Sequence, residues 1–429
     1  MLEQKHTLLV GFDLCSNKSQ ISCFNKNTFE PVSLIADVIN DSEMISMDIA
    51  VNVKTGEWYF GEEAVDNSAF SEDITLLENF LDYVKKGETI PLGDNSIDSV
   101  EVLARFFRKY LSILKRYFPS ETIKKIVVTV EKSNAIYVRT IFKALEKIGI
   151  EKERVSVIDH SISYVYYALS QKKELWMNDV ALFDFGSEGL KYYQLSIDRK
   201  HRPITVSVEC TDYSQQLSMD LFGVIYVEQL RYIFETISRE CLYKQIVSTI
   251  YVTGKGFEKS WADGVIKNLC VGRRAFKGQN LFCAGACYAA REISGEANHF
   301  EDYMFLNEDM IKGSVSVKAY ADAKDSEIYL VKTGTAWYEA ELSADFILDD
   351  ETPGTKEVEV IVRNDLLNAK SSYIIALEGL NVRPNKTTRL KIRVKFIDAT
   401  TCVLTIKDMG FGDFAKETNR VWEKVIEMI

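Results

Sequence analysis

The sequence lacks the features by which chains bind nucleic acid or enter a membrane. Its 429 residues carry a formal net charge of −11, and no run of basic residues interrupts this acidic balance. That balance argues against nucleic acid or an anionic membrane as the main partner. No apolar stretch approaches the length that a bilayer-spanning helix needs. We therefore expect a protein with neither partner.

Export and cysteine-metal signals are also missing. The opening residues, MLEQKHTLLVGFDL, lack the basic start, long apolar run and small-residue cleavage site of a signal peptide. Most of the eight cysteines lie in apolar contexts, which suits reduced thiols. Cys283 and Cys287 form the single C-x-x-x-C pair, whereas a zinc site normally needs four ligands. We expect a cytoplasmic protein without a metal at that pair.

Apolar residues are plentiful enough for several cores. With 46% hydrophobic and 27% charged residues, a chain of this length is expected to form two or three domains. From Thr7, the pattern TLLVGFDLCSNKSQISCF predicts a strand, a turn and a returning strand. Residues 99–118 have helical periodicity and are closed by Pro119. The segments that follow predict a buried strand, IKKIVVTVEKS, and an amphipathic helix, AIYVRTIFKALEKIGI.

A second round repeats this scheme. Strand, turn and strand are predicted again in VALFDFGSEGLKYYQLSID, followed by a helical pattern over residues 220–241. STIYVTGKGF then predicts a strand that ends in glycines, and GACYAAREI the start of a helix. Two similar α/β halves predict two lobes around a cleft, at residues 1–178 and 179–300.

The pattern changes beyond residue 300. Seven short runs with period-two alternation, separated by Gly, Asp, Asn and Pro, predict an all-β domain over residues 301–429. The last segment, AKETNRVWEKVIEMI, favours a short helix whose apolar face is Trp422, Val425 and Ile426. Met304, Phe305 and Leu306, in EDYMFLNED, suit equally an interdomain linker that docks on lobe II and a buried first strand.

These parts, in this order, resemble the heat-shock protein 70 (DnaK-type chaperone) family of the actin/hexokinase-like ATPase superfamily. The family's two phosphate motifs are similar to LLVGFDLCSN and VALFDFGSEGL, and its adenosine motif to IYVTGKGF. Its connecting helix resembles VSVIDHSISYVYYAL, and the helix after the adenosine motif resembles GQNLFCAGACYAA. The resemblance covers nearly the whole chain, although no single motif is specific. It implies a two-lobed, actin-like (ribonuclease H-like) ATPase fold followed by a β-sandwich similar to the chaperones' peptide-binding domain.

The resemblance also implies a site. Nucleotide would contact Asp13, Ser16, Asn17, Asp184, Gly186, Ser187, Gly254 and Gly256. Asp13 and Asp184 would hold Mg²⁺ through water, while the turns present backbone N–H groups to the phosphates. As alternatives from the residues alone, both acids suit ordinary turns at strand ends, and both glycines suit a plain strand-to-helix turn.

Several positions depart from the family pattern. Cys15 and Asn17 stand where the family prefers glycine and threonine. Glu188 occupies a glycine position and would bring negative charge to the phosphates, at a cost on the order of 1 kcal/mol. Lys191 replaces a second acid; it could contact a phosphate but cannot hold magnesium. His160 matches the catalytic glutamate: it could orient water, although capping of the helix is favoured.

Length departs from the pattern too. Only 70 positions separate Asp184 from Gly254, too few for the insertion that walls the adenine in the chaperones. We expect a reduced lobe II and no helical lid. Tyr164, Tyr166 and Tyr167 are expected to pack in their helix rather than stack on a ligand.

Two functions remain open. The first is a divergent chaperone-like protein: a pseudo-ATPase or weak ATP/ADP binder, with little or no hydrolysis, whose β domain binds a protein or extended peptide. The second is a structural or interaction protein that has lost nucleotide binding altogether. A sugar-kinase-like phosphotransferase has little support, because it would leave the β domain unexplained.

Overall fold

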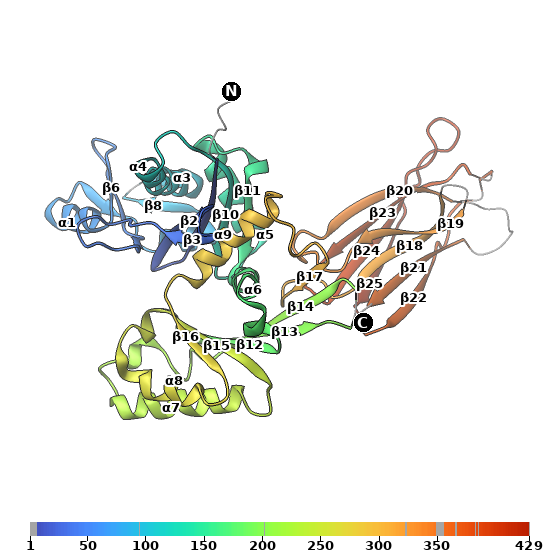
Figure 1. Cartoon of the computed structure of the whole chain (residues 1–429). Coiled ribbons are helices and arrows are strands. Elements are labelled where there is room, and N and C mark those ends of the chain that lie inside the picture. Colours follow the sequence, from blue (N-terminus) through green and yellow to red (C-terminus); the bar gives the residue numbers. More distant parts are fainter. Residues whose placement is uncertain are drawn as a thin grey trace, which may run out of the picture. The chain divides into compact units, whose positions relative to one another are not determined.

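The computed structural model describes residues 7–93, 95–200, 202–321, 324–348, 356–364, 367–381, 383–384 and 386–428. The chain divides into two compact units, Met1–Tyr303 and Met304–Ile429, and each is described by itself. Unit 1 contains two large sheets (Figure 1). We call the part built on the first sheet lobe I and the part built on the second lobe II.

The lobe I sheet has the order β11-β10-β1-β2-β3, with β4 paired to β2. Its strands are β1 (Thr7–Leu14), β2 (Lys18–Asn25), β3 (Glu30–Ser33), β4 (Ile45–Ser46), β10 (Thr122–Val130) and β11 (Val155–Asp159). The predicted hairpin of β1 and β2 and the predicted buried strand β10 are confirmed. β1 pairs with β10 in parallel, so both strands end at the same edge of the sheet.

Strand alternation gives this sheet two buried faces. Val10 and Phe12 of β1 face one core together with α3 (Ser99–Leu111) and α5 (Ala135–Lys147). Leu9 faces a second core together with α9 (Leu281–Ile293). Because successive side chains of a strand point to opposite faces, a continuous apolar run such as that of β1 suits a strand covered on both sides.

Side chains cap the starts of two lobe I helices, α3 and α5. Asp98 accepts a hydrogen bond from the Val100 N–H at the start of α3, and Asn134 accepts one from the Tyr137 N–H at the start of α5. The predicted helix over residues 99–118 is divided at Ser112 into α3 and α4 (Ile113–Tyr117). The remaining elements of the lobe are β5 (Ile49–Asn52), β6 (Trp58–Phe60), α1 (Glu62–Phe70), β7 (Ile74–Leu76), α2 (Phe80–Lys86), β8 (Thr89–Leu92) and β9 (Asn95–Asp98).

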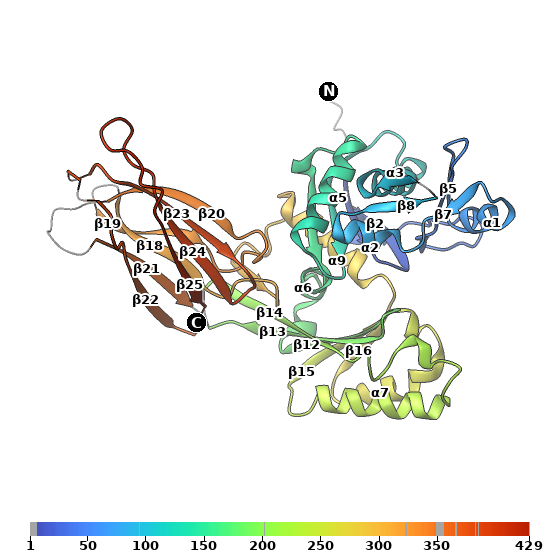
Figure 2. The ribbon, with the colours of Figure 1, turned by 180° about the vertical axis from the view of Figure 1, so that it is seen from behind.

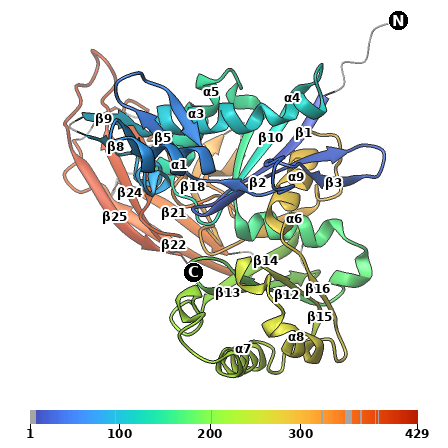
Figure 3. The ribbon, with the colours of Figure 1, turned by 90° about the vertical axis from the view of Figure 1, so that its left-hand side faces the viewer.

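Lobe II repeats the strand-turn-strand unit. Within unit 1, its sheet has the order β16-β15-β12-β13-β14. The strands are β12 (Asp179–Phe185), β13 (Leu190–Asp198), β14 (Ile204–Asp212), β15 (Val247–Thr253) and β16 (Arg274–Lys277), and β17 (Tyr303–Leu306) spans the boundary between the two units along the chain. In the described chain between β12 and β15, the only elements are β13, β14, a short 3-10 turn and α7 (Val227–Cys241). α7 and α8 (Asp263–Leu269) cover one face of this sheet (Figure 3).

Two helices lie between the two sheets, α6 (His160–Ser170) and α9 (Figure 1). Although α9 falls within the residues expected to form lobe II, it packs on β1, β2 and β10 of lobe I. Glycines allow this approach: a Cβ on Gly11 would lie 2.4 Å from the Cys283 O, and one on Gly285 would lie 2.1 Å from the Ser163 O. Tyr164 of α6 is fully buried and packs against Tyr193 and Tyr251, as expected.

Unit 2 consists of two four-stranded sheets, β19-β18-β21-β22 and β20-β23-β24-β25 (Figure 2). The strands are β18 (Ser314–Ala321), β19 (Lys324–Val331), β20 (Glu341–Ile347), β21 (Glu357–Asn364), β22 (Ala369–Ala376), β23 (Arg389–Phe396), β24 (Thr401–Asp408) and β25 (Val421–Glu427). Alternate residues of both sheets, such as Val360 and Ile392, share one core. The unit is thus an antiparallel sandwich, in which every predicted β run forms a strand.

The predicted C-terminal helix is wrong, because these residues form β25 at the edge of the sheet, paired with β24. Ile426 is fully buried, whereas Val425 is 59% exposed. A helix would have placed both on one apolar face. Trp422 and Ile426 are four positions apart, a spacing that suits one face of a helix and one face of a strand equally.

In the part of the chain that the structure describes, no helix is long and apolar enough to cross a membrane.

Candidate functional site

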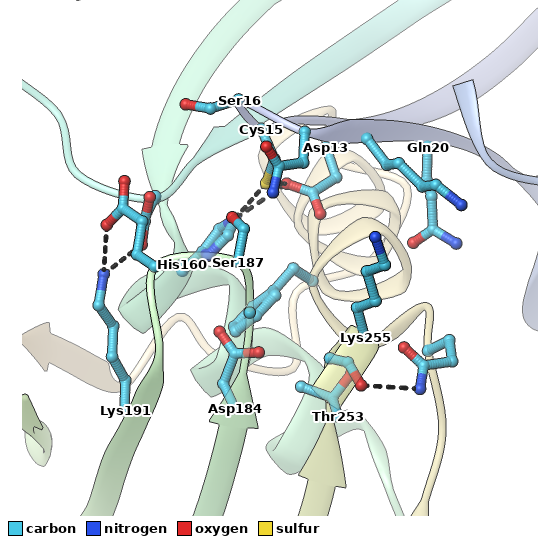
Figure 4. A pocket seen from close by; sticks show the side chains of 18 of the residues that line it. Asp13, Cys15, Ser16, Gln20, His160, Asp184, Ser187, Lys191, Thr253 and Lys255 are labelled. Atoms are coloured by element: carbon cyan, nitrogen blue, oxygen red, sulfur yellow. Dashed lines mark hydrogen bonds and ion pairs between the residues drawn. The ribbon is translucent and has the colours of Figure 1, made fainter. Parts of the chain in front are cut away.

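A cavity of about 130 Å³ lies within unit 1, where the ends of β1, β12 and β15 meet (Figure 4). Asp13 and Asp184 occupy equivalent places beside it, since each lies next to the end of the first strand of a hairpin. Their cross-strand partners, Gln20 and Lys191, also line the cavity. The predicted repetition of one unit in each lobe therefore brings both acids to one site.

The Asp13 carboxylate makes side-chain contacts with His160 and Cys15. It is 7% exposed, and its Oδ1 lies 2.9 Å from the Nε2 of His160 and accepts a hydrogen bond from the Cys15 Sγ at 3.2 Å. Cys15 Sγ also lies 3.5 Å from the same Nε2. Burial, followed by the charge of Asp13, raises the pKa of the Cys15 thiol well above its ordinary value. The three side chains form one compact cluster.

His160 does not cap its helix, contrary to the favoured expectation. Asp159 is the capping residue, because its side chain accepts a hydrogen bond from the Ile162 N–H at 2.8 Å. The His160 ring instead stacks on Phe282, with ring centroids 3.8 Å apart and planes 8° from parallel. Burial alone would lower the pKa of His160, but the Asp13 carboxylate outweighs it, so that the imidazole has a raised pKa. The Asp13 carboxylate therefore favours the protonated, cationic form of this imidazole.

Lys191 is held by two carboxylates. Its ammonium pairs with Glu131 and, at 3.2 Å, with Glu188 (Figure 4). Burial alone would raise the pKa of Glu131, but Lys191 outweighs it and the pKa is lowered. The same pairing raises the pKa of Lys191 against the effect of burial. Lys191 is therefore already neutralised, and Glu188 faces a lysine rather than an unbalanced site.

Asp184, unlike Asp13 and Lys191, has no partner among the described residues that balances its charge. It is half-buried, and no hydrogen bond from any described residue reaches its carboxylate. Burial raises its pKa to about 7; Glu131 and Asp13 add to this rise, and His160 and Lys191 oppose it. Of the two acids expected to hold magnesium, one is thus paired with an imidazole and the other is close to half-protonated at neutral pH.

The turn residues line the cavity as expected: Ser16, Asn17, Gly186 and Ser187. The Ser16 hydroxyl accepts a hydrogen bond from Lys85 Nζ at 3.0 Å. Gly186 follows Asp184 by two positions, where the sequence suits a tight bend without a side chain, but a Cβ there would meet nothing within 4 Å, so this prediction is wrong. The constrained glycine is Gly189, with φ +130° and a built Cβ 2.5 Å from Ser214.

The glycines after β15 have two different roles. Gly254 lines the cavity with φ +98°, and a Cβ there would lie 2.4 Å from the Phe185 O. A Cβ at Gly256 would lie 2.3 Å from the Phe185 ring, and this residue is outside the cavity lining. Between them, Lys255 points its ammonium into the cavity (Figure 4). Among described residues, no carboxylate pairs with this ammonium, which is thus available to an anion.

The donor atoms around Asp13 do not fit a magnesium site. Mg²⁺ prefers oxygen ligands and water in octahedral geometry, whereas the neighbours of the Asp13 carboxylate are a thiol and an imidazole. The metal-ligand cluster found in the described part of the chain is Asp13, Cys15 and His160, without Asp184. The expected hold of Asp13 and Asp184 on magnesium runs through water, so this arrangement of direct ligands does not test it, and it stays a prediction.

Sequence reasoning missed several residues of the site: Gln20, Lys85, Glu131, Gln279 and Phe282. Glu131 could have been predicted from the sequence, because it directly follows the buried strand β10. Asp13 and Asp184 likewise lie near the ends of their strands. Phe282 carried none, since an apolar residue at the start of a helix predicts only packing.

Comparison with known families covers nearly the whole chain. The family model described as "Family of unknown function (DUF5716) C-terminal" matches residues 30–308. A second model, described as "Domain of unknown function (DUF8552)", matches residues 310–428. No curated protein matches the sequence. The junction between the two matches falls close to the boundary between the two compact units.

Proposed function

The chain belongs to the DUF5716 family of unknown function, and we propose from its cleft that it is a pseudo-ATPase. In this proposal the actin-like, two-lobed architecture binds ATP or ADP weakly and does not hydrolyse it. The sandwich is the binding domain of this divergent, chaperone-like protein, and it binds a protein or an extended peptide. The two equivalent strand-turn-strand units support the first part of this proposal.

The observation that carries the proposal is the pairing of Asp13 with His160 at 2.9 Å. A magnesium-dependent ATPase needs this carboxylate free to hold the ion and its waters. Here an imidazole supplies the neutralising charge, and Lys191 stands where a second acid would be needed. Hydrolysis therefore lacks both its metal site and its acidic pair.

Weak nucleotide binding is still supported by what the cleft retains. Lys255 offers an ammonium to the cavity, and Gly254 keeps the turn open because no side chain can be placed there. Backbone N–H groups in such turns attract phosphate oxygens. Lobe II has no insertion to wall the adenine in the described residues between β12 and β15, so we expect affinity from the phosphates alone, in the millimolar range.

The sandwich suits a protein partner because its sheets end in exposed edges. β22 and β25 each lie at the edge of a four-stranded sheet. Ile374 of β22 is 63% exposed, and Val421 and Val425 of β25 are also exposed. An extended peptide can add to such an edge through main-chain hydrogen bonds, with pockets for alternate side chains. We also propose a cytoplasmic location, since all eight cysteines are free thiols.

The same ion pairs favour a second candidate, a scaffold that has lost nucleotide altogether. Lys191 is paired with Glu131 and Glu188, and Asp13 is paired with His160. Each phosphate contact by Lys191 would have to break an existing pair. In this candidate the cleft serves only to hold the lobes together.

Thermal unfolding with ATP or ADP separates the two candidates. At ten times its Kd, a ligand adds about 1.4 kcal/mol to folding stability, which raises Tm by about 2 °C in a unit of about 300 residues. With a Kd of about 1 mM, we expect this rise at about 10 mM nucleotide, with or without Mg²⁺. Lys255→Ala should remove most of it. The control, Lys259→Ala, changes an exposed lysine that does not line the cavity, and the rise should persist.

No rise at 10 mM nucleotide would exclude nucleotide binding and leave the second candidate. A rise that strictly requires Mg²⁺ would contradict the role given to the Asp13–His160 pair.

A further inference from the structure

Three potential metal ligands converge at one wall of the cavity. Asp13 is next to the end of β1, Cys15 lies in the turn that follows, and His160 begins α6. Their ligand atoms are 2.9 Å apart for Asp13 Oδ1 and His160 Nε2, 3.2 Å for Asp13 Oδ1 and Cys15 Sγ, and 3.5 Å for Cys15 Sγ and His160 Nε2. Residues far apart in the sequence thus form a triangle of oxygen, sulfur and nitrogen.

The size of this triangle matches one face of a zinc tetrahedron. With Zn–S near 2.3 Å and Zn–N or Zn–O near 2.0–2.1 Å, tetrahedral ligand atoms lie about 3.3–3.6 Å apart. The measured separations are equal to this or a few tenths of an ångström shorter. A small outward movement of the Asp13 oxygen would therefore admit an ion without any change of backbone.

The surroundings of the three ligands leave room for a fourth metal ligand. Asp13 and His160 are 7% and 3% exposed, while Cys15 is half-buried, and all three line the cavity. Stacking on Phe282 holds the imidazole plane in place. Three protein ligands and a fourth position open to a cavity are typical of zinc sites that bind water or a small ligand.

The choice of metal follows from the donor set. Thiolate and imidazole are ligands that Zn²⁺ prefers and Mg²⁺ does not. The same donors are the reason that the cluster fails as a magnesium site. Cys15 and His160, which spoil a phosphate-binding turn and a catalytic glutamate position, are together explained by one function.

We propose that Asp13, Cys15 and His160 bind one Zn²⁺ ion, with the fourth position open to the cavity. Binding releases the thiol proton of Cys15 to solvent, and an imidazolium at His160 also releases its Nε2 proton. A neutral ring that carries its proton on Nε2 moves it to Nδ1 instead, so that Nε2 can bind the ion. This inference needs no nucleotide and stands whether or not the pseudo-ATPase proposal holds. His160 Nδ1 has no hydrogen-bond partner among described residues, and the lack of such a partner weakens metal binding about 10–100-fold. A site of moderate affinity is therefore expected.

Metal titration of the full chain tests the proposal. Chelator-treated protein is titrated with Co²⁺, which replaces Zn²⁺ and reports a thiolate ligand by charge-transfer absorption in the near ultraviolet. Zn²⁺ affinity is then measured by displacing the Co²⁺. We expect one ion per chain, no competition from millimolar Mg²⁺, and a loss of affinity of at least about tenfold in Cys15→Ser and in His160→Asn.

Matched controls separate this site from other thiols and imidazoles. Cys270 is an exposed thiol, and His299 is an imidazole paired with Glu292. Cys270→Ser and His299→Asn should leave both the charge-transfer band and the affinity unchanged. Circular dichroism establishes that each variant is folded.

A measurement on the unmodified protein covers the case in which a site variant fails to fold. Zn²⁺ should slow the alkylation of Cys15, read by mass spectrometry of its peptide, and leave that of Cys270 unchanged. Absence of the thiolate band in the wild-type chain, its survival in folded Cys15→Ser, or equal alkylation of Cys15 with and without Zn²⁺ would each overturn the proposal.

Discussion

Asp13 and Asp184 occupy equivalent strand ends, yet their surroundings give them different chemistry. Asp13 is paired with His160 and Cys15. Asp184 receives no hydrogen bond from the described residues, and its pKa is raised to about 7, mainly by burial. At the scale of single residues, the site is therefore asymmetric: Asp13 is paired with an imidazole, and Asp184 changes its charge near neutral pH.

This asymmetry predicts the pH dependence of stability. The unfolded Asp184 loses its proton near pH 4 and the folded one near pH 7, so wild-type stability falls as pH rises through that window. Asp184→Asn removes the free-energy cost of ionising this carboxyl group in the folded protein. Since water partly screens the half-buried group, we expect the variant to be more stable than wild type by about 1–3 kcal/mol at pH 8, and by progressively less as pH falls towards 4.

Urea unfolding across this pH range measures the effect. The control is Asp220→Asn, a change on the exposed surface, which should leave the pH profile as in wild type. A stability gain that is the same at pH 5 and pH 8 would show that titration of Asp184 is not its cause.

Single residues also show how far sequence reasoning reaches. Asp13, Ser16 and Gly254 could be placed at the cavity because each lies at or just after the end of a strand, and strand ends can be read from the pattern. The pairing of Lys191 with Glu131 could not. These residues are 60 positions apart on different sheets, and their contact depends on how the two lobes pack, which no local pattern encodes.

At the scale of elements, β25 offers a direct test of strand geometry. Ile426 is fully buried and Val425 is 59% exposed. We expect Ile426→Ala to destabilise the sandwich by about 2–4 kcal/mol through a lost core contact, and Val425→Ala to change it by less than about 1 kcal/mol. Hydrogen exchange of the β23, β24 and β25 amides in the full chain measures both. Equal effects would indicate that the two side chains share a face, as in a helix.

The packing of α9 on α6 depends on one small residue. A Cβ on Gly285 would lie 2.1 Å from the Ser163 carbonyl oxygen, so Gly285→Ala forces the helices apart. Overpacking costs about 1–3 kcal/mol, more than a helix gains from alanine. The control is Gly264→Ala in α8, where the added Cβ meets nothing within 4 Å and stability should rise by up to about 1 kcal/mol.

Urea unfolding midpoints of the two alanine variants give the comparison. If Gly285→Ala is as stable as wild type, the close approach of α6 and α9 is not a constraint on the fold.

Helices and strands could be predicted where the apolar residues followed a single period, either that of a helix or that of a strand. The hairpins of both lobes, α5 and the strands of the sandwich follow from period-two or 3.6-residue patterns. β25 was missed because the spacing of Trp422 and Ile426 fits the periods of a helix and of a strand equally. The segment forms a strand because it pairs with β24. α9 was assigned to the wrong lobe, because its small residues predict close packing without naming the partner strand.

At the scale of the whole molecule, a unit built on two strand-turn-strand repeats is followed by a separate sandwich. In the cavity of the first unit, Asp13 and Lys191 are paired within the protein, whereas Lys255 and Asp184 are left without an ion-pair partner among the described residues. We propose that the chain acts by binding rather than by turnover: it binds a nucleotide or a metal ion in the cavity, and a protein at the sandwich edges.

Phosphate release from Mg·ATP tests this account most directly. The full chain is incubated with radiolabelled ATP over many hours, beside Asp13→Asn and a protein-free blank. We predict no release above the blank by either protein, because His160 is paired with Asp13 and Lys191 stands opposite Asp184 among the described residues of the cavity. Magnesium-dependent release by the wild-type chain that Asp13→Asn abolishes would contradict it.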